Sequence, residues 1–328
     1  MKIRTYFSKR FREKIKELEI MGSVPVLKVE NLCKSYGRKS ILKNISFEVE
    51  RGDVFGFLGP NGSGKTTTIR SVLGLIRKNS GKVSVLGSDM DNEFLKGIKN
   101  VGAVVETPKF HDHLSGKANL KLIANLHSEL GDADVERVLK LVGMWDRSKH
   151  KVKTYSLGMR QRLGIAMALI NRPKLVILDE PTNGLDPQGI KEVRELIVRL
   201  AEKEGITFFI STHLLAEVEQ ICNRVVIIEA GKTVVEGRVN ELLDKDYDRA
   251  EISCEPAERA KTIIESLDYV DLDADSTGDL IVKVQKGRQR DLNKELFSAG
   301  IDIDYVVPCN QSLEDYFIEV TKGGIANV

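Results

Sequence analysis

Apolar residues between positions 26 and 237 follow two kinds of spacing, which alternate along the chain. Short unbroken apolar runs such as Val54–Leu58 and Leu175–Leu178 are typical of strands buried on both faces. The longer amphipathic stretches between such runs predict helices. This alternation indicates an α/β fold in which helices pack on a sheet. The predicted strands are Val26–Glu30, Ile41–Glu50, Val54–Leu58, Lys82–Leu86, Val101–Val105, Leu175–Leu178, Thr207–Ile210 and the hairpin Val225–Glu229 with Thr233–Glu236, and the predicted helices are Lys65–Leu75, Gly158–Asn171, Ile190–Ala201 and Leu214–Ile221.

Two further predicted helices, Ser115–Leu130 and Asp132–Val142, follow one another without a strand between them. They predict a helical subdomain inserted in the α/β fold at residues 107–155. After Gly237 the order changes to strand, helix, two strands, helix and strand, which fits a small α+β, ferredoxin-like domain. Its predicted elements are Ala250–Cys254, Ala257–Ser266, Val270–Asp273, Leu280–Val284, Gln289–Ala299 and Ile301–Val307, with a final helix near Leu313–Val320.

We therefore expect three parts: an N-terminal extension at residues 1–24, an α/β domain at 25–240, and an accessory domain at 241–328. The extension is basic, with 7 Lys+Arg and 3 Glu in residues 1–20, and its apolar residues share one face of a helix. Such a helix can lie on an anionic membrane surface or dock on a partner. It can equally be a solvated extension that precedes a translation start at Met21. The apolar residues are Ile3, Phe7, Phe11, Ile15 and Leu18.

The net charge of +2 combines two parts of opposite sign. Residues 241–328 contain 10 Lys+Arg and 20 Asp+Glu, whereas residues 1–240 contain 40 and 28. The acidic accessory domain would repel a phosphate backbone, so we expect no nucleic-acid partner. No run approaches the ~20 apolar residues of a membrane helix, and no signal peptide is expected. The four cysteines lack metal-ligand spacing, which suits a reducing compartment.

Residues 59–66 read GPNGSGKT, a complete GxxxxGK[ST] motif between a predicted buried strand and a predicted helix. Glycines in such a loop allow backbone N–H groups to surround a phosphate at a helix N-terminus. Lys65 adds positive charge against the terminal phosphates, and the Thr66 hydroxyl can bind Mg²⁺. The motif indicates a P-loop nucleoside triphosphatase.

A second candidate element is the apolar run Leu175–Leu178, which ends in the adjacent carboxylates Asp179 and Glu180. Asp179 would support Mg²⁺, and Glu180 would act on the attacking water as a base or orienting group. Adjacent acidic residues at a strand end are common, so this motif indicates a nucleotide site only in combination with the phosphate loop.

Three further segments complete a pattern. Residues 155–162 read YSLGMRQR at a predicted helix start, residues 181–186 read PTNGLD, and residues 211–213 read STH after the next predicted strand. In this order the motifs resemble those of the ATP-binding cassette (ABC) ATPases, across Val26–Gly237. The nearest resemblance is to the nucleotide-binding subunits of bacitracin-type drug and peptide exporters. The implied fold is an ABC cassette, with a mixed sheet core and a helical subdomain.

The resemblance also implies roles for single residues. Tyr36 would stack on adenine, Ser156 and Gly158 would form the family signature, and Asp186 would belong to the D-loop. His213 would be the switch histidine that contacts the γ-phosphate, so the catalytic set is Glu180, His213 and Lys65. The nucleotide-binding loop would consist of Gly59, Pro60, Asn61, Gly62, Ser63, Gly64, Lys65, Thr66 and Thr67.

The chain departs from the family pattern at two places. Leu157 and Met159 replace the first Gly and the Gln of the usual signature Leu-Ser-Gly-Gly-Gln. Glu106 occupies the Q-loop position, where most members carry a Gln linked to Mg²⁺. A carboxylate there can still face Mg²⁺, so we expect Thr66, Asp179 and Glu106 to form the Mg²⁺ site.

The implied function is ATP hydrolysis that powers a transporter, with ATP and Mg²⁺ as cofactors. ATP would lie between the phosphate loop of one subunit and the signature of a second, and we prefer a homodimer to a heterodimer. The transport path would be a separate polytopic membrane permease, which places this chain peripherally on the cytoplasmic face of the membrane. Export follows from the branch that the chain resembles, while the residues themselves leave direction and cargo open.

Two other function classes were weighed against the transporter. Soluble ABC ATPases of translation or DNA repair usually carry two cassettes or long coiled coils, and this sequence shows neither an internal repeat nor long heptads. A P-loop small-molecule kinase would need no signature and no switch histidine. For the accessory domain, dimer contact or regulation, a ligand sensor and a passive appendage all remain open, and we prefer the first.

Overall fold

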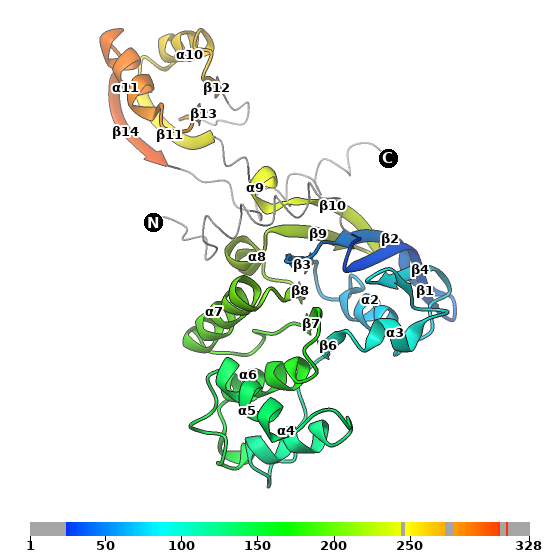
Figure 1. The fold of residues 1–328 in the computed structure, drawn as a ribbon. Helices are drawn as coiled ribbons and strands as arrows, with labels where there is room; N and C mark the ends of the chain where they lie inside the picture. Colours follow the sequence, from blue (N-terminus) through cyan, green and yellow to red (C-terminus); the bar gives the residue numbers. More distant parts are fainter. Residues whose placement is uncertain (1–23, 244–246, 273–278, 309–312, 314–328) are drawn as a thin grey trace. The chain divides into compact units, whose positions relative to one another are not determined.

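The structure, a computed structural model, describes residues 24–243, 247–272 and 279–308 together with Leu313. The predicted helix at residues 1–20 lies outside the described residues, and so does the predicted final helix apart from Leu313. The chain divides into two compact units between Val239 and Asn240 (Figure 1). Each unit is described by itself.

The first unit is built on a six-stranded sheet with the strand order β10-β9-β3-β8-β7-β6. All neighbouring strands in it are parallel except the hairpin of β9 and β10. The carboxyl ends of β3, β8, β7 and β6 therefore lie along one edge, where α/β sheets bind ligands. The strands are β3 (Val54–Leu58), β6 (Val101–Val104), β7 (Leu175–Asp179), β8 (Thr207–Thr212), β9 (Arg224–Glu229) and β10 (Lys232–Arg238).

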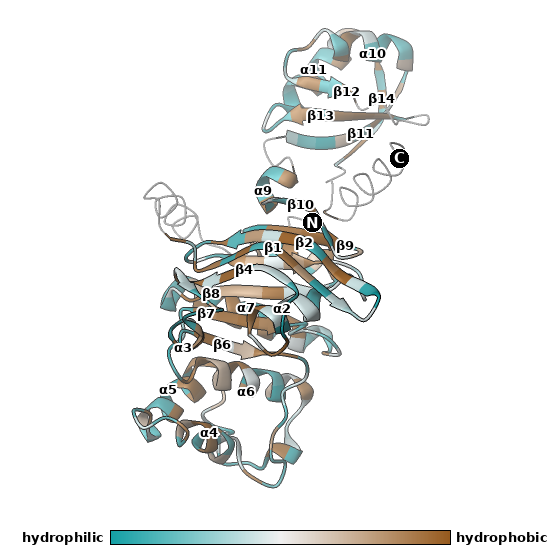
Figure 2. Cartoon of the chain, turned by 90° about the vertical axis from the view of Figure 1, so that its right-hand side faces the viewer, coloured by the Kyte–Doolittle hydropathy of each residue, from teal (hydrophilic) through white to brown (hydrophobic). Residues whose placement is uncertain are grey.

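A second, antiparallel sheet with the order β2-β1-β4-β5 covers one face of this parallel sheet. Phe47 of the antiparallel sheet packs between Phe55, Phe57 and Phe209, with ring centroids 5.2–5.7 Å away. Burying such rings is among the largest apolar contributions to a core. Figure 2 shows the hydrophobic character of strands such as β6 and β7. The antiparallel strands are β1 (Leu27–Tyr36), β2 (Lys39–Val49), β4 (Ser80–Val85) and β5 (Ser88–Asp89).

Helix α2 (Lys65–Val72) packs in the same apolar core as the antiparallel sheet, whereas α8 (Leu215–Ile221) approaches the opposite face of β3. The predicted end of α2 at Leu75 was three residues too late, because Gly74 adopts φ +68° and closes the helix. Helix α7 (Pro187–Glu204) is longer than predicted at both ends. Asp186 caps its N-terminus and Gly205, with φ +65°, follows its last turn. Short helices α3 (Phe94–Ile98) and α9 (Val239–Leu242) were not predicted.

The predicted helical insertion at residues 107–155 contains α4 (Gly116–Ala124), α5 (Asp132–Leu141) and a 3₁₀ turn at Val152–Thr154, and α6 (Leu157–Leu169) follows it. Helix α4 was predicted to reach Leu130. It ends at Ala124, and the next apolar residue, Leu126, is 77% exposed, so no buried face continues the helix.

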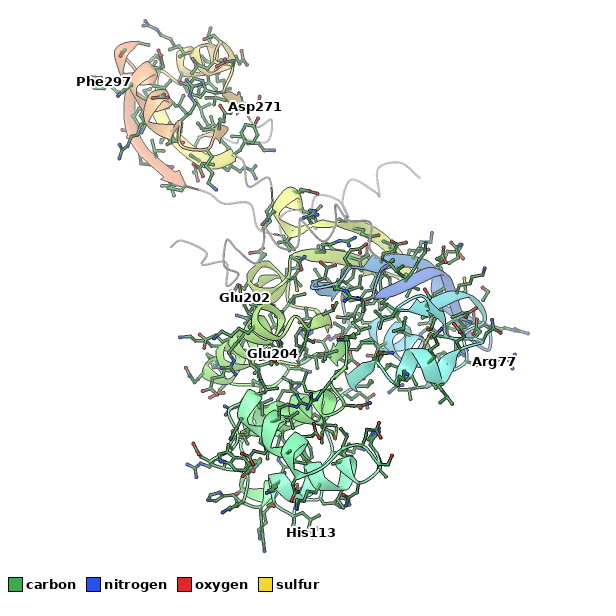
Figure 3. The ribbon with its side chains drawn as sticks, in the orientation of Figure 1. Arg77, His113, Glu202, Glu204, Asp271 and Phe297 are labelled. Atoms are coloured by element: carbon green, nitrogen blue, oxygen red, sulfur yellow. The ribbon has the colours of Figure 1, made fainter. Side chains whose placement is uncertain are left out.

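The second unit has the strand order β12-β13-β11-β14, with every neighbouring pair antiparallel. Ile252, Val282, Leu292 and Leu296 are fully buried in its core, while Phe297 lies on the outer side of α11 (Figure 3). This order is the one that a split βαβ unit requires. The ferredoxin-like assignment and the accessory role stay predictions. The elements are β11 (Tyr247–Glu255), α10 (Ala257–Glu265), β12 (Val270–Leu272), β13 (Leu280–Gln285), α11 (Gln289–Ser298) and β14 (Asp302–Pro308).

Candidate nucleotide-binding site

The phosphate loop, residues 59–67, connects β3 to α2, and two of its positions require glycine. A Cβ atom on Gly59 would lie 2.3 Å from the carbonyl oxygen of Ile228, so any side chain would force the backbone apart. Gly64, at the N-cap of α2, adopts φ +114°, which side chains rarely permit. The loop therefore presents bare backbone at the start of a helix, where N–H groups favour anions.

Lys65 lies inside this loop, and its side chain is only 6% exposed. Its Nζ donates to the carbonyl oxygens of Gly59 at 2.7 Å and Pro60 at 3.2 Å, and it lies 3.3 Å from Oε1 of Glu180. A phosphate oxygen offers this ammonium a charged acceptor in place of neutral carbonyls. Ser63 Oγ is buried without a hydrogen-bond partner among the described residues, which leaves a polar group inside the loop for a ligand.

Asp179, the last residue of β7, is 4% exposed and lies beside the phosphate loop. Its Oδ2 accepts a hydrogen bond of 3.0 Å from Thr66 Oγ1, and its Oδ1 accepts one from Ser211. Carboxylate and hydroxyl oxygens are the ligands that Mg²⁺ prefers, usually together with water and substrate phosphates. The donor set fits such an ion. Within the described ranges, no group of three or more His, Cys, Asp or Glu side chains could hold a metal by itself.

Glu180 connects the loop to the end of β8. Its Oε2 lies 2.8 Å from Nδ1 of His213, while Oε1 faces Lys65. The backbone of Glu180 has φ +49°, and its N–H donates to the carbonyl oxygen of Ser211 at 3.1 Å. Strained backbone of this kind is often found where a side chain must be aimed at a reacting group. The structure thus brings Lys65, Glu180 and His213 together, as predicted.

Glu106 follows the end of β6 and has φ +63°. Its carboxylate forms an ion pair with Arg70 of α2, and its side chain is 62% exposed. The predicted contact of Glu106 with Mg²⁺ therefore stays a prediction, since in this structure Arg70 is its partner.

Ser156 and Asp186 both cap helices. Ser156 Oγ accepts from the N–H of Met159 at 3.2 Å at the start of α6, and Asp186 Oδ1 accepts from the N–H of Gly189 at 3.0 Å at the start of α7. A Cβ on Gly158 would lie 3.8 Å from the Cα of Gly189, so the two helix starts adjoin. They form a second cluster, built on different elements from the phosphate loop.

Tyr36, at the end of β1, is 50% exposed, and Nζ of Lys34 lies 4.8 Å from its ring centre. An exposed ring is available for stacking, and its contact with adenine stays a prediction.

Comparison with known proteins identifies the family. Residues 42–183 match the family described as ABC transporter. The chain is 46% identical over 297 residues to a Bacillus subtilis protein named "Uncharacterized ABC transporter ATP-binding protein YdbJ", an alignment that covers 90% of this chain and 96% of the relative. The chain belongs to the ABC transporter ATP-binding proteins. It is therefore an ABC ATPase.

Other members of the ABC family support the same assignment. The "Bacitracin transport ATP-binding protein BcrA" of Bacillus licheniformis is 39% identical over 300 residues, covering 91% of this chain and 98% of the relative. Among solved structures, cbiO1 of Clostridium perfringens, "Part of the ABC transporter complex cbiONQ", superposes with a TM-score of 0.62 at 27% identity, over 74% of this chain and 96% of that chain. The cassette fold predicted from the sequence is confirmed.

Several residues of this ABC ATPase site were missed by sequence reasoning. Ser211 contacts Asp179, and Arg70 pairs with Glu106. Glu217, a buried carboxylate of α8, accepts from Thr212, which directly precedes His213. Helix α8 also contains Glu219 and Gln220, so no local signal in the sequence distinguished Glu217.

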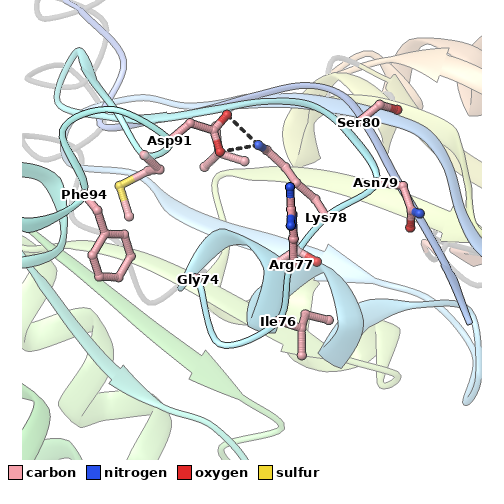
Figure 4. A pocket seen from close by; sticks show the side chains of 11 residues that line it. Gly74, Ile76, Arg77, Lys78, Asn79, Ser80, Asp91 and Phe94 are labelled. Carbon is pink, nitrogen blue, oxygen red and sulfur yellow. Dashed lines mark hydrogen bonds and ion pairs between the residues drawn. The ribbon is translucent and has the colours of Figure 1, made fainter.

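A cavity of about 650 Å³ is lined by none of the predicted site residues. It lies between the end of α2, β4 and α3, and Figure 4 shows Phe94 and the ion pair of Lys78 with Asp91 on its walls. Nucleotide binding in ABC ATPases uses the phosphate loop and not this cavity. Among the helices in the described part of the chain, none has the length and apolar character that crossing a bilayer requires.

Proposed function

We propose that this ABC ATPase powers the export of peptide antibiotics or related drugs through a separate membrane permease. The proposal rests on the complete phosphate site, in which Lys65, Glu180 and His213 are in contact. It is supported by 39% identity with a bacitracin transport protein over nearly the whole of both chains. The cargo class follows from that relative's name.

The proposed working form is a dimer with ATP between two chains. One chain carries one phosphate loop and one helix-start cluster of Ser156, Gly158 and Asp186, so two copies would complete two sites. A homodimer is the simplest assembly, because each chain carries both halves. Closure on the γ-phosphate and opening after hydrolysis is a general form of nucleotide-driven switching.

The proposed catalytic roles follow from the contacts. Glu180 would accept a hydrogen bond from the attacking water, and His213, on the other oxygen of the same carboxylate, would hold that carboxylate in place. Lys65 would move from its carbonyl partners to the phosphate oxygens. Thr66, Asp179 and Glu106 would hold Mg²⁺, which neutralises phosphate charge when bound.

The permease is proposed to dock on the cytoplasmic side, near the Q-loop and the helical insertion. Phe94, which lines the cavity of Figure 4, and its chain neighbour Leu95 are exposed, Leu95 to 79%, and so is Leu75, next to the lining residue Gly74. Exposed apolar groups gathered in this way are typical of protein interfaces. This placement makes the chain a peripheral membrane subunit.

The test uses the tagged full-length chain purified from its host in mild detergent. We expect a polytopic membrane protein to co-purify, and vesicles that contain both to take up a labelled cyclic peptide antibiotic when ATP is added. Glu180→Gln should lower ATP hydrolysis and uptake by about 100-fold or more, because it removes the group that acts on water. Glu195→Gln, an exposed carboxylate of α7, is the matched control and should retain both. Co-purification with ribosomes or DNA, without a membrane protein, would support the soluble ATPase class instead.

A further inference from the structure

Glu217 is a buried carboxylate outside the predicted site. It lies on α8, is 2% exposed, and accepts a hydrogen bond of 3.0 Å from Thr212 Oγ1. The same Thr212 oxygen accepts from the N–H of Leu214 at 3.1 Å. Thr212 and Leu214 flank His213, so Glu217 fixes the segment that carries the switch histidine.

The partner of Glu217 is Arg194 on α7, 3.4 Å away. Arg194 also donates to Oε1 of Gln220 at 2.6 Å, which places a second contact on α8. Helix α7 begins at the Asp186 cap, only about two turns before Arg194. The ion pair thus joins the helix that starts at the D-loop to the segment that holds His213.

A buried ion pair is an expensive way to hold two helices together. The free energy lost by removing both charges from water often exceeds the free energy gained from their attraction. Apolar side chains of similar volume commonly stabilise a protein at least equally. Arg194 also has a buried Nε without a partner among the described residues. A pair kept under these conditions is better explained by the geometry that it imposes than by stability.

We propose that Glu217 is a positioning residue for His213. By holding Thr212, it fixes the imidazole where Nδ1 meets Glu180, and through Arg194 it ties that position to α7. A movement of the D-loop helix therefore changes the contact between His213 and Glu180. This inference rests on the catalytic roles proposed for Glu180 and His213, and it adds a residue that acts through Thr212.

The test compares two buried carboxylates, each paired with an arginine. Glu217→Gln keeps the side-chain volume and removes the charge, and we expect kcat for ATP to fall about 10-fold while KM changes less than about 2-fold, because small misplacements of a catalytic group reduce turnover. The matched control is Asp53→Asn, since Asp53 is 0% exposed and pairs with Arg224 at the other end of the sheet. Asp53→Asn should lower the melting temperature and leave kcat unchanged. Equal kcat for the wild type and Glu217→Gln would overturn the proposal.

Two more measurements keep the proposal testable if Glu217→Gln folds poorly. Arg194→Lys retains the charge, and we expect it to reduce kcat less than Arg194→Met does. In a protein that already carries His213→Gln, adding Glu217→Gln should lower kcat no further. If the fold-reduction in kcat of the double variant equals the product of the two single fold-reductions, Glu217 does not act through His213.

A spectroscopic measurement separates this inference from the proposed function. In ¹⁵N-histidine spectra of the five histidines, Glu217→Gln should shift the His213 ring signals and Asp53→Asn should not. An inactive wild type would refute the ATPase function, whereas an unmoved His213 signal in an active protein would refute the positioning role alone.

Discussion

The parallel sheet carries charged networks at both ends, and they differ in how their members are paired. At the carboxyl end, Lys65 is held by two carbonyl oxygens and one carboxylate, and Glu180 joins it to His213. At the amino end, Asp53 accepts from Asn223 at 2.6 Å, from the N–H of Glu50 at 2.9 Å, and from Arg224 at 3.4 Å. Both ends bury charge, yet only the first has partners that a phosphate can replace.

The difference lies in the backbone as much as in the charges. At the carboxyl end, Glu106 and Glu180 have positive φ. Three positions of the phosphate region have positive φ or leave no room for a side chain, as Gly64 and Gly59 show. At the amino end, Asp53 directly precedes β3 and Arg224 opens β9, and the positive φ beside Asp53, +85°, belongs to a glycine, Gly52. Backbone strain at non-glycine residues is thus concentrated at the carboxyl end, as expected for a ligand site. The charged residues of the amino-end network lack such strain, as expected for a structural network.

Of the substitutions at the two ends of the sheet, Asp53→Asn is predicted to weaken folding most. The Asn amide would place its N–H group against the donors that now bind the Asp53 carboxylate, and it would leave Arg224 without the charge of Asp53. Removing one member of a buried ion pair typically costs about 3 kcal/mol or more. Urea unfolding of the first unit would measure this loss as a lower transition midpoint. ATP hydrolysis by the folded protein should be unchanged. A loss of turnover with unchanged stability would place Asp53 in the functional network and break the comparison.

The two ends also differ in how far the sequence predicted them. Lys65, Thr66, Asp179 and Glu180 belong to contiguous motifs at strand ends, and parallel strands place such ends at one edge. Their meeting could therefore be expected before the structure was known. Helix ends were predicted less well: α7 was expected at Ile190–Ala201, although Asp186 and Gly205 mark its actual ends.

The residues that support the site could not be predicted in the same way. Ser211, Arg70 and Glu217 act through side-chain contacts with residues 23 to 36 positions away, which depend on how helices and strands pack. No local spacing encodes such contacts. The same is true of Asp53, whose side-chain partners Asn223 and Arg224 lie about 170 residues away.

A change of intermediate size concerns Arg70, the ion-pair partner of Glu106, which we propose as a Mg²⁺ ligand at the carboxyl end. Arg70→Met should lower the Mg²⁺ concentration needed for half-maximal nucleotide binding by about threefold, since an exposed pair contributes less than about 1 kcal/mol. Fluorescent ADP binding across a Mg²⁺ titration measures this without turnover. In a Glu106→Gln background the shift should vanish, and if it persists, Arg70 acts on the nucleotide directly.

The smallest expected effect is at the amino end, where Glu50 lies near Asp53. Burial, opposed by Arg224 and aided by Asp53, raises the pKa of Glu50 above its ordinary value of 4.5. The folded state therefore binds more protons than the unfolded state just above pH 4.5, and stability falls as pH rises through the raised pKa. Glu50→Gln lacks this penalty, so it should stabilise the protein at pH 7 by a few tenths of a kcal/mol after solvent screening, and the gain should fade as pH falls to 4.5. Urea unfolding at both pH values, with the exposed Glu195→Gln as control, measures it. A gain that grows on acidification would mean that Glu50 is stabilised as a charged member of the amino-end network.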